Sequence, residues 1–300
     1  MAIVHAVGSA SGHSITDCHF LGHRWDPDGG IEEGRRESGI YRKEGKQTQG
    51  VLGRQGGYED LYRLDSGRVY VVTSGGELLT SDTPRRGGGA WVSQRLPRVN
   101  RVWGLHDNLV FAWNSIRKEV HVFDGSTWSR VPTGFMVTAI HGVAADLIYA
   151  CGWGGSIMRW RGHAFHPATV APKRPFFSIF IVNEDEMYAT LNKQSIWEGS
   201  VSGWSERTSP RSDWDLLSIA KWNDRLWLGD QVRGLCVLDD KGELQTIKPN
   251  LSADRIEARS KLLVSSCVAV AGSDDGTKFK RISDKLIEKA MGTRRPLWEK

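Results

Sequence analysis

The chain has 300 residues, of which 39% are hydrophobic, 34 are glycine and 13 are tryptophan, and its formal net charge is +5. No apolar run is long enough to cross a bilayer as a helix, which argues against a membrane protein. The cysteines are too scattered to predict a zinc site or a redox pair. The first residues lack the basic start and continuous apolar segment of a signal peptide, so we expect a cytoplasmic protein.

Residues 4–27 begin the chain with two strand-like runs. Their order of glycine, isoleucine, Gly-His, aromatic and proline residues returns at 150–167. Because the later stretch fits the second and third strands of a repeat, we expect the chain to begin on a second strand. The same segment holds a group of potential metal ligands: His13, Asp17, Cys18, His19 and His23. Strand alternation would separate Cys18 from Asp17 and His19, and the spacing matches no metal-ligand pattern, so we predict no metal site.

Residues 28–57 interrupt this pattern. The segment is rich in glycine and charge and poor in apolar residues, which is typical of a chain that cannot pack. We therefore predict a long flexible insertion over 28–57. Long loops are either filler or partner-binding arms, and the sequence favours neither.

Five later segments share one order of features, in which an apolar run with an aromatic residue, a polar turn and a second run are followed by proline. These segments cover 69–97, 109–132, 148–167, 187–210 and 226–249. Equivalent positions recur every 38 to 43 residues, at Tyr70, Phe111, Tyr149, Tyr188, Trp227 and, more weakly, Val270. A fixed period of about 40 residues predicts a repeat architecture.

The repeats read as strands and not as helices. Their apolar runs are four to six residues long, alternate in places and contain many β-branched and aromatic residues. No repeat contains a long amphipathic stretch, which argues against a helical solenoid. Four short strands per period match one blade of a β-propeller.

At this point the chain resembles the broad WD40, kelch and Asp-box group of β-propellers. The resemblance is architectural and covers most of residues 1–282, because no blade carries a complete signature; "GSDDGTKF" at 272–279 is one residue short of an Asp-box. It implies an all-β, single-domain propeller over 1–300, with seven blades, or six if residues 1–27 complete the last repeat. We expect the C-terminal segment to supply the missing inner strand of the first blade and close the ring. Residues 284–300 remain open between an outer strand and a short helix.

Blade topology predicts where the turns lie. Turns between first and second strands lie on one face, and turns between second and third strands lie on the other with the links between blades. The first kind is acidic or asparagine-rich, as at 183–186, whereas the second kind is basic and contains tryptophans. Tryptophan beside arginine is the composition of binding hot spots. We therefore predict a partner-binding surface made of Arg98, Arg101, Trp113, Arg117, Trp153, Lys173, Arg174, Arg211, Trp214 and Arg233.

The sequence gives no positive sign of catalysis. Residues 84–91, "PRRGGGAW", resemble an anion-binding loop but lack the strand-to-helix context of a phosphate loop. A sialidase-like propeller would need clustered arginines and a Tyr–Glu nucleophile pair, and the chain has only 6 tyrosines. There is no nucleophile elbow or metalloprotease motif. We predict no catalytic residue, metal or cofactor.

These observations favour a non-enzymatic propeller that binds an acidic protein partner. One concrete form is a cytoplasmic immunity protein that neutralises a toxin by covering its active site. The alternative is a carbohydrate-active, sialidase-like propeller or a sugar-binding protein. Nucleic-acid binding ranks third because no RNA-binding motif is present, and we expect no membrane partner.

Overall fold

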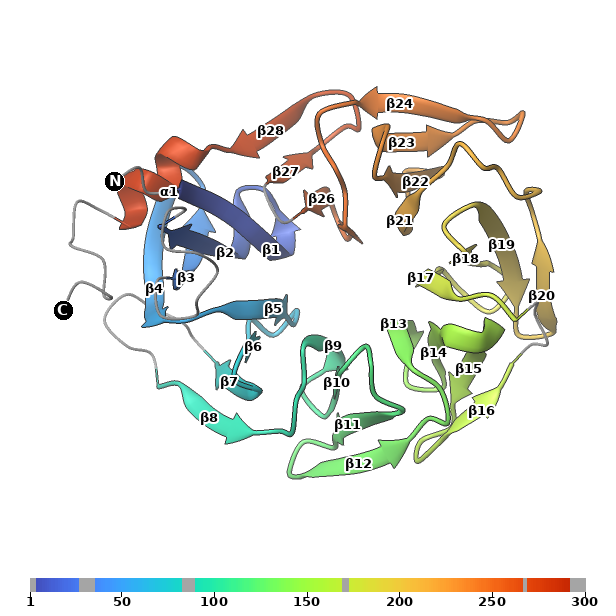
Figure 1. Ribbon diagram of the computed structural model, residues 1–300, viewed down its shortest axis with the longest axis horizontal. Coiled ribbons are helices and arrows are strands. Elements are labelled where there is room, and N and C mark those ends of the chain that lie inside the picture. Colours follow the sequence, from blue (N-terminus) through green and yellow to red (C-terminus); the bar gives the residue numbers. More distant parts are fainter. Residues whose placement is uncertain (1–3, 27–35, 83–89, 169–172, 267–268, 292–300) are drawn as a thin grey trace. The chain divides into compact units, whose positions relative to one another are not determined.

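A computed structural model describes residues 4–26, 36–82, 90–168, 173–266 and 269–291. These residues form seven four-stranded antiparallel sheets and one short helix, the architecture of a seven-bladed β-propeller (Figure 1). The predicted all-β fold and the count of seven blades are confirmed. The chain divides into two compact units: the terminal unit, Met1–Val102 with Arg259–Lys300, and the central unit, Trp103–Ala258. No helix among the described residues is long and apolar enough to span a membrane.

Each blade takes its strands from consecutive residues. The first contains β1 (Val4–Ser14), β2 (Asp17–Trp25), β3 (Arg36–Glu44) and β4 (Gln47–Gln55). The second contains β5 (Tyr58–Arg63), β6 (Val69–Thr73), β7 (Glu77–Ser81) and β8 (Val92–Arg95). The third contains β9 (Arg101–His106), β10 (Leu109–Trp113), β11 (Glu119–Phe123) and β12 (Trp128–Pro132). The fourth contains β13 (Val137–Ala144), β14 (Leu147–Gly152), β15 (Ile157–Trp160) and β16 (Phe165–Pro167).

The remaining blades follow the same order. The fifth contains β17 (Phe176–Ile181), β18 (Met187–Leu191), β19 (Ser195–Ser200) and β20 (Gly203–Glu206). The sixth contains β21 (Leu216–Trp222), β22 (Arg225–Asp230), β23 (Gly234–Leu238) and β24 (Leu244–Lys248). The seventh contains β25 (Arg255–Ala258), β26 (Leu262–Ser265), β27 (Val270–Ser273) and β28 (Phe279–Ile282), and is followed by α1 (Asp284–Met291).

The first blade corrects two expectations. Most of the predicted insertion, residues 36–55, is the hairpin of β3 and β4, whereas 27–35 lie outside the described residues. Buried Ile40, Tyr41 and Val51 supply its apolar contacts, and its other positions are polar because an outer hairpin needs only sparse burial. The chain also begins on the first strand of this blade, so the C-terminal segment supplies no strand to it.

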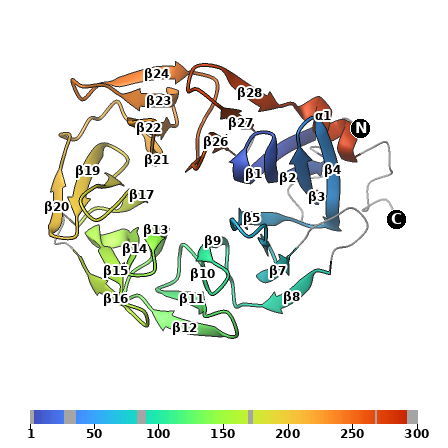
Figure 2. The same cartoon turned by 180° about the vertical axis from the view of Figure 1, so that it is seen from behind.

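Closure instead comes from side chains packed between the first and last blades. Val7 and Phe20 of the first blade share a buried cluster with Leu263 and Val270 of the seventh. Leu286 of α1 packs against this cluster, and α1 lies beside β1 and β4 in both views (Figures 1 and 2). The N- and C-terminal blades therefore meet, as predicted, but through packed side chains and not through a shared blade. Residues 284–291 form the helix that the sequence left open.

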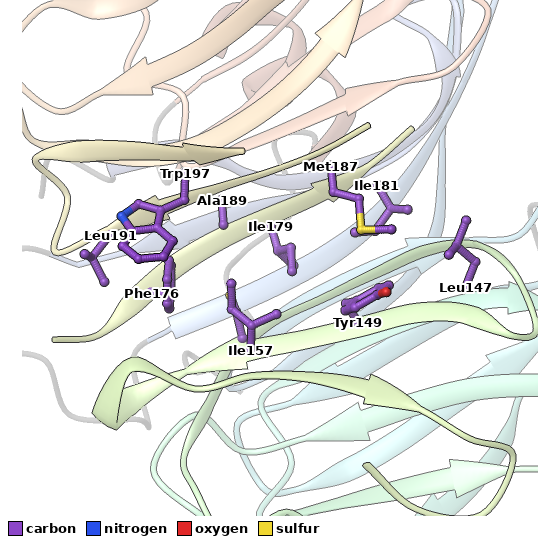
Figure 3. Close-up of a cluster of buried hydrophobic side chains, with 11 residues drawn as sticks. Leu147, Tyr149, Ile157, Phe176, Ile179, Ile181, Met187, Ala189, Leu191 and Trp197 are labelled. Carbon is purple, nitrogen blue, oxygen red and sulfur yellow. The ribbon is translucent and has the colours of Figure 1, made fainter. Parts of the chain in front are cut away.

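The predicted aromatic positions belong to the cores between blades. Tyr70, Phe111, Tyr149, Tyr188 and Trp227 are all buried on second strands. Figure 3 shows one such core, where Tyr149 and Ile157 of the fourth blade meet Ile179 of the fifth. Burial of each large side chain stabilises the fold by about 1.5–3 kcal/mol. Val270 departs from the pattern because it lies on the third strand of its blade, β27.

Innermost strands are also joined by hydrogen bonds from side chains to the backbone of the next blade. In the central unit, Thr138 Oγ1 donates to the Phe176 carbonyl at 2.7 Å, and Ser218 Oγ donates to the Ala253 carbonyl at 2.6 Å. The Ile219 amide donates to Ser178 Oγ at 3.2 Å. In the terminal unit, the Val102 amide donates to Asp60 Oδ2 at 3.0 Å. These polar side chains replace apolar contact where the innermost strands meet.

Candidate functional site

In the central unit, turns and links lie together on one surface, which we call the turn face. It consists of residues 114–118, 133–136, 153–155, 173–175, 192–194, 207–215 and 231–233. Backbone hydrogen bonds join each turn to a link: Thr133 to Lys118, Trp153 to Met136, Asn192 to Pro175, Arg211 to Gln194 and Gln231 to Asp215. The predicted grouping of these segments is therefore present within this unit.

Two tryptophans predicted to be binding anchors are core residues. Trp113 is 4% exposed because it ends β10, a second strand that is buried between blades. Trp214 is 3% exposed, and the Arg211 guanidinium lies 5.5 Å from its ring centroid. Neither side chain is available to a partner, so both predictions are wrong.

Trp153 is the tryptophan that the turn face exposes. Its side chain is 45% accessible, on a short 3-10 turn from Trp153 to Gly155. Gly154 has a φ of 76°, which favours glycine and lets the chain turn sharply beneath the indole. The Trp153 ring lies 6.5 Å from that of half-buried Phe177, and Lys193 Nζ lies 5.3 Å from the Phe177 centroid. An exposed tryptophan and a half-buried phenylalanine therefore lie beside a cation.

Charges on one part of the turn face are neutralised within the chain. Arg211 pairs with Glu243 at 2.7 Å and with Asp213 at 3.4 Å. Arg233 also pairs with Asp213, and Lys193 pairs with Asp215 at 3.1 Å. We call this the Asp213 sector. Arg211 and Arg233, both predicted to bind a partner, therefore share Asp213 of the turn face, and Arg211 also pairs with Glu243 from the turn before β24.

A second part of the face keeps its positive charge, and we call it the Trp153 sector. It comprises Ile116, Arg117, Lys118, Trp153, Lys173, Arg174 and Phe177. The four cations are exposed and form no ion pair with a carboxylate among the described residues. Ile116, next to Arg117 in the chain, is 72% exposed. It could not be predicted from the sequence, because one isoleucine in a turn carries no periodic signal. The predicted residues Arg117, Trp153, Lys173 and Arg174 thus lie in one sector.

The other two predicted residues, Arg98 and Arg101, belong to the terminal unit. Both are exposed, and Arg101 begins β9. Arg98 has a φ of 57°, in the left-handed region, within the turn that follows Pro97. Most of the glycine-rich segment at 84–91 lies outside the described residues.

A Tyr–Glu pair is present, but its state differs from that of an activated nucleophile. Tyr188 Oη donates to Glu186 Oε1 at 2.6 Å, and Lys221 Nζ contacts the same oxygen at 2.5 Å. Burial and this hydrogen bond raise the pKa of Tyr188. Although burial opposes it, hydrogen bonds from Lys221 and Tyr188 lower the pKa of Glu186. Tyr188 is therefore harder to ionise than a free tyrosine, the opposite of what a nucleophile requires.

Two of the clustered histidines of the first blade, His19 and His23, are buried. Burial, and then the nearby Arg63 and Arg42, lower the pKa of His19 to about 3. Burial and Arg36 lower the pKa of His23 to about 3, and His23 Nδ1 lies 2.8 Å from Ser38 Oγ. No group of three or more His, Cys, Asp or Glu within the described ranges is arranged to hold a metal ion.

Comparison with known proteins identifies the fold. No protein-family model and no curated protein sequence matches the chain. Among solved structures, the WD40 propeller domain of Doa1 has a TM-score of 0.67 at 11% identity, covering 89% of this chain and 92% of that one. The chain is a propeller of this general kind. The expected likeness to WD40 propellers is confirmed at the level of fold.

Other similar structures differ in function. YCF48 bound to D1 peptide has a TM-score of 0.61 at 12% identity, covering 93% of this chain and 95% of that one. A catalytically inactive virginiamycin B lyase from Staphylococcus aureus with quinupristin has a TM-score of 0.63 at 14% identity, covering 78% and 86%. Because both binding proteins and a lyase share the fold, the likeness carries no function by itself.

Proposed function

We propose that this protein binds an acidic partner protein through the Trp153 sector. The observation that carries the proposal is an exposed tryptophan among cations that are not neutralised within the described chain. Trp153 offers apolar area for a central contact, and the surrounding charges steer a partner of opposite sign. The Asp213 sector borders this surface without adding net charge, which would favour docking on one side of the turn face.

One concrete form of this function is an immunity protein that covers the active site of a toxin in the cytoplasm. Its support is the combination of a rigid β-scaffold with an aromatic anchor and steering charges, as fast and tight protein association requires. The structure of YCF48 with a peptide supports the fold as a binding scaffold. A carbohydrate-active enzyme is the alternative, and the pairing of Tyr188 with Glu186 and Lys221 argues against that pair as its nucleophile.

The test begins with affinity capture of a partner from the native cells and continues with binding kinetics. Trp153→Ala should weaken affinity by about 30-fold, about 2 kcal/mol, mainly through faster dissociation. Replacing Lys173 and Arg174 together with glutamate should slow association most strongly at low salt. Trp128→Ala and Arg161→Glu are controls, because these residues lie on an outer strand and on a third-to-fourth-strand turn of the same unit.

Two outcomes separate the general function from its specific form. If the captured partner is toxic when expressed alone, wild-type protein should relieve the toxicity and the Trp153→Ala variant should not. If the partner is harmless but its binding still depends on Trp153, the binding function is supported and the immunity role is excluded. Equal binding by wild type and all Trp153-sector variants would show that the wrong surface was chosen.

A further inference from the structure

A row of polar side chains crosses the first blade on the face that meets the second blade. In the strand register, Ser11 pairs with His19, His19 with Arg42, and Arg42 with Gln49, so the four side chains share one side of the sheet. Ser11 Oγ accepts a hydrogen bond of 2.9 Å from the Arg63 amide of β5. The row therefore faces β5 across the space between the blades.

Several nitrogen atoms in this row are buried without a hydrogen-bond partner. His19 is only 2% exposed, and neither of its ring nitrogens has a hydrogen-bond partner in the described part of the chain. The Nε atoms of Arg42 and Arg63 are buried and unpartnered in the same way. A buried polar group without a partner destabilises the fold, so a molecule that satisfied these groups would bind favourably.

The two guanidinium groups are held in place by carboxylates at their outer nitrogens. Arg63 Nη1 lies 2.5 Å from Asp17 Oδ1, and Arg42 Nη2 lies 3.1 Å from Glu44 Oε2. These contacts do not use the two Nε–H groups, which stay buried and unpartnered. A small surface hollow is lined by Arg42, Glu44, Gln47 and Gln49, so the row borders solvent at its Arg42–Gln49 end.

We propose that His19, Arg42 and Arg63 form a binding site for a small protonated oxyanion, of which dihydrogen phosphate is the best match. Its oxygens would accept hydrogen bonds from the two Nε–H groups. A neutral imidazole has one donor and one acceptor nitrogen, so His19 would donate to another oxygen and accept from a P–O–H group. Sulfate carries no proton near neutral pH and cannot make that last bond.

The charges around the site define its pH dependence. Asp17 and Glu44 already balance Arg63 and Arg42, so a singly charged anion fits better than a doubly charged one. Burial, Arg63 and Arg42 lower the pKa of His19 to about 3, which keeps the ring neutral during binding. The protein should therefore bind phosphate more tightly at about pH 6, where more of the phosphate is the singly charged dihydrogen form, than at about pH 8, where most of it is doubly charged.

The test measures the melting temperature of the full chain while inorganic phosphate or sulfate replaces chloride at constant ionic strength. Phosphate should raise the melting temperature with concentration, because a ligand that binds only the folded state stabilises it. The rise should exceed that with sulfate and be larger at the lower pH. Arg42→Lys keeps the charge but removes the Nε–H, and should weaken phosphate affinity at least about tenfold by isothermal titration, on the scale of a lost hydrogen bond to a charged group.

Two further variants keep the test decisive. His19→Gln should also lose the stabilisation by phosphate. If His19→Gln does not fold, the result for Arg42→Lys decides whether the site exists. His121→Ala is the matched control, because His121 Nε2 is also buried without a partner but lies in the third blade. Absence of any phosphate effect, or an effect that sulfate matches and Arg42→Lys retains, would overturn the proposal.

Discussion

Two tryptophans that the sequence predicts to be exposed in turns have opposite environments on the turn face. Trp153 follows Gly152 and precedes two glycines, and its ring is exposed. Trp214 follows the polar run "PRSD", yet its ring is buried and lies beside the Arg211 guanidinium. Turn composition predicts a loop in both cases, but whether a loop folds back over its own side chain depends on contacts that only the tertiary structure supplies.

This contrast predicts different effects on stability. Trp214→Ala should lower the free energy of unfolding by about 3–5 kcal/mol, because it leaves a cavity in a packed core. Trp153→Ala should change it by less than about 0.5 kcal/mol, as expected for an exposed side chain. Urea denaturation of both variants checks the difference. A larger loss for Trp153→Ala would mean that its contact with Phe177 is part of the core.

Buried histidines predict a loss of stability in mild acid. The pKa values of His19 and His23 are about 3 in the folded chain, below the ordinary value of 6.5. As pH falls below 6.5, the unfolded chain binds protons that the folded chain does not, so the destabilisation grows until pH approaches 3. Each residue should cost roughly 2 kcal/mol at about pH 5.

Denaturation curves at several pH values test this expectation. His23→Asn should flatten the slope between about pH 6.5 and about pH 5, since one of the two titrating groups is gone. The same substitution at exposed His163 provides the control. A slope unchanged by His23→Asn would show that other groups cause the acid sensitivity.

Among the elements, β3 and β4 were the hardest to foresee from sequence. The period of about 40 residues predicted most second strands through their aromatic residues. Residues 36–55 lack that signal, because only a few of their side chains are buried and the rest face solvent or a polar row. Their pairing with β2 depends on a long first hairpin, β1 and β2, which no other blade repeats at that length.

Pairing on both sides predicts that β3 resists proteolysis. The bonds after Arg42 and Lys43 lie inside a strand held by β2 and β4, so trypsin should leave them intact under native conditions. Arg117 and Lys118, in an exposed turn, should be cut earlier. Limited digestion followed by mass spectrometry gives the order of cleavage. An early cut after Arg42 would mean that this hairpin opens locally.

For the molecule as a whole, we expect the contact between the first and last blades to contribute strongly to the stability of the fold. Removing residues 1–12 deletes most of β1, including Val7 and Ala10, and uncovers Leu263 and Val270. The exposed edge of β2 and the exposed core should cause aggregation or a large fall in melting temperature. Removing 284–300 deletes α1 and should cost less, about 1.5–3 kcal/mol for the contact of Leu286. A soluble 1–12 truncate with unchanged melting would contradict this account of closure.

The candidate surface was only partly predictable at this scale. Topology placed the basic turns of the central unit on one face, and backbone hydrogen bonds bear this out. Which charges remain available was not predictable, because Arg211, Arg233 and Lys193 each form an ion pair with a carboxylate from another segment of the chain. Charge composition identifies a face, whereas ion pairing decides which part of it can attract a partner.

The hydrogen bonds between innermost strands bear on how such a chain can evolve. Thr138, Ser178 and Ser218 each bond to a backbone group of the next blade. Every residue has a backbone carbonyl, and every residue except proline has a backbone N–H. A mutation in one blade therefore leaves the acceptor or donor for its neighbour in place. Blades joined in this way can drift in sequence almost independently, which helps to explain how propellers only 10–14% identical to this chain keep the same arrangement of strands.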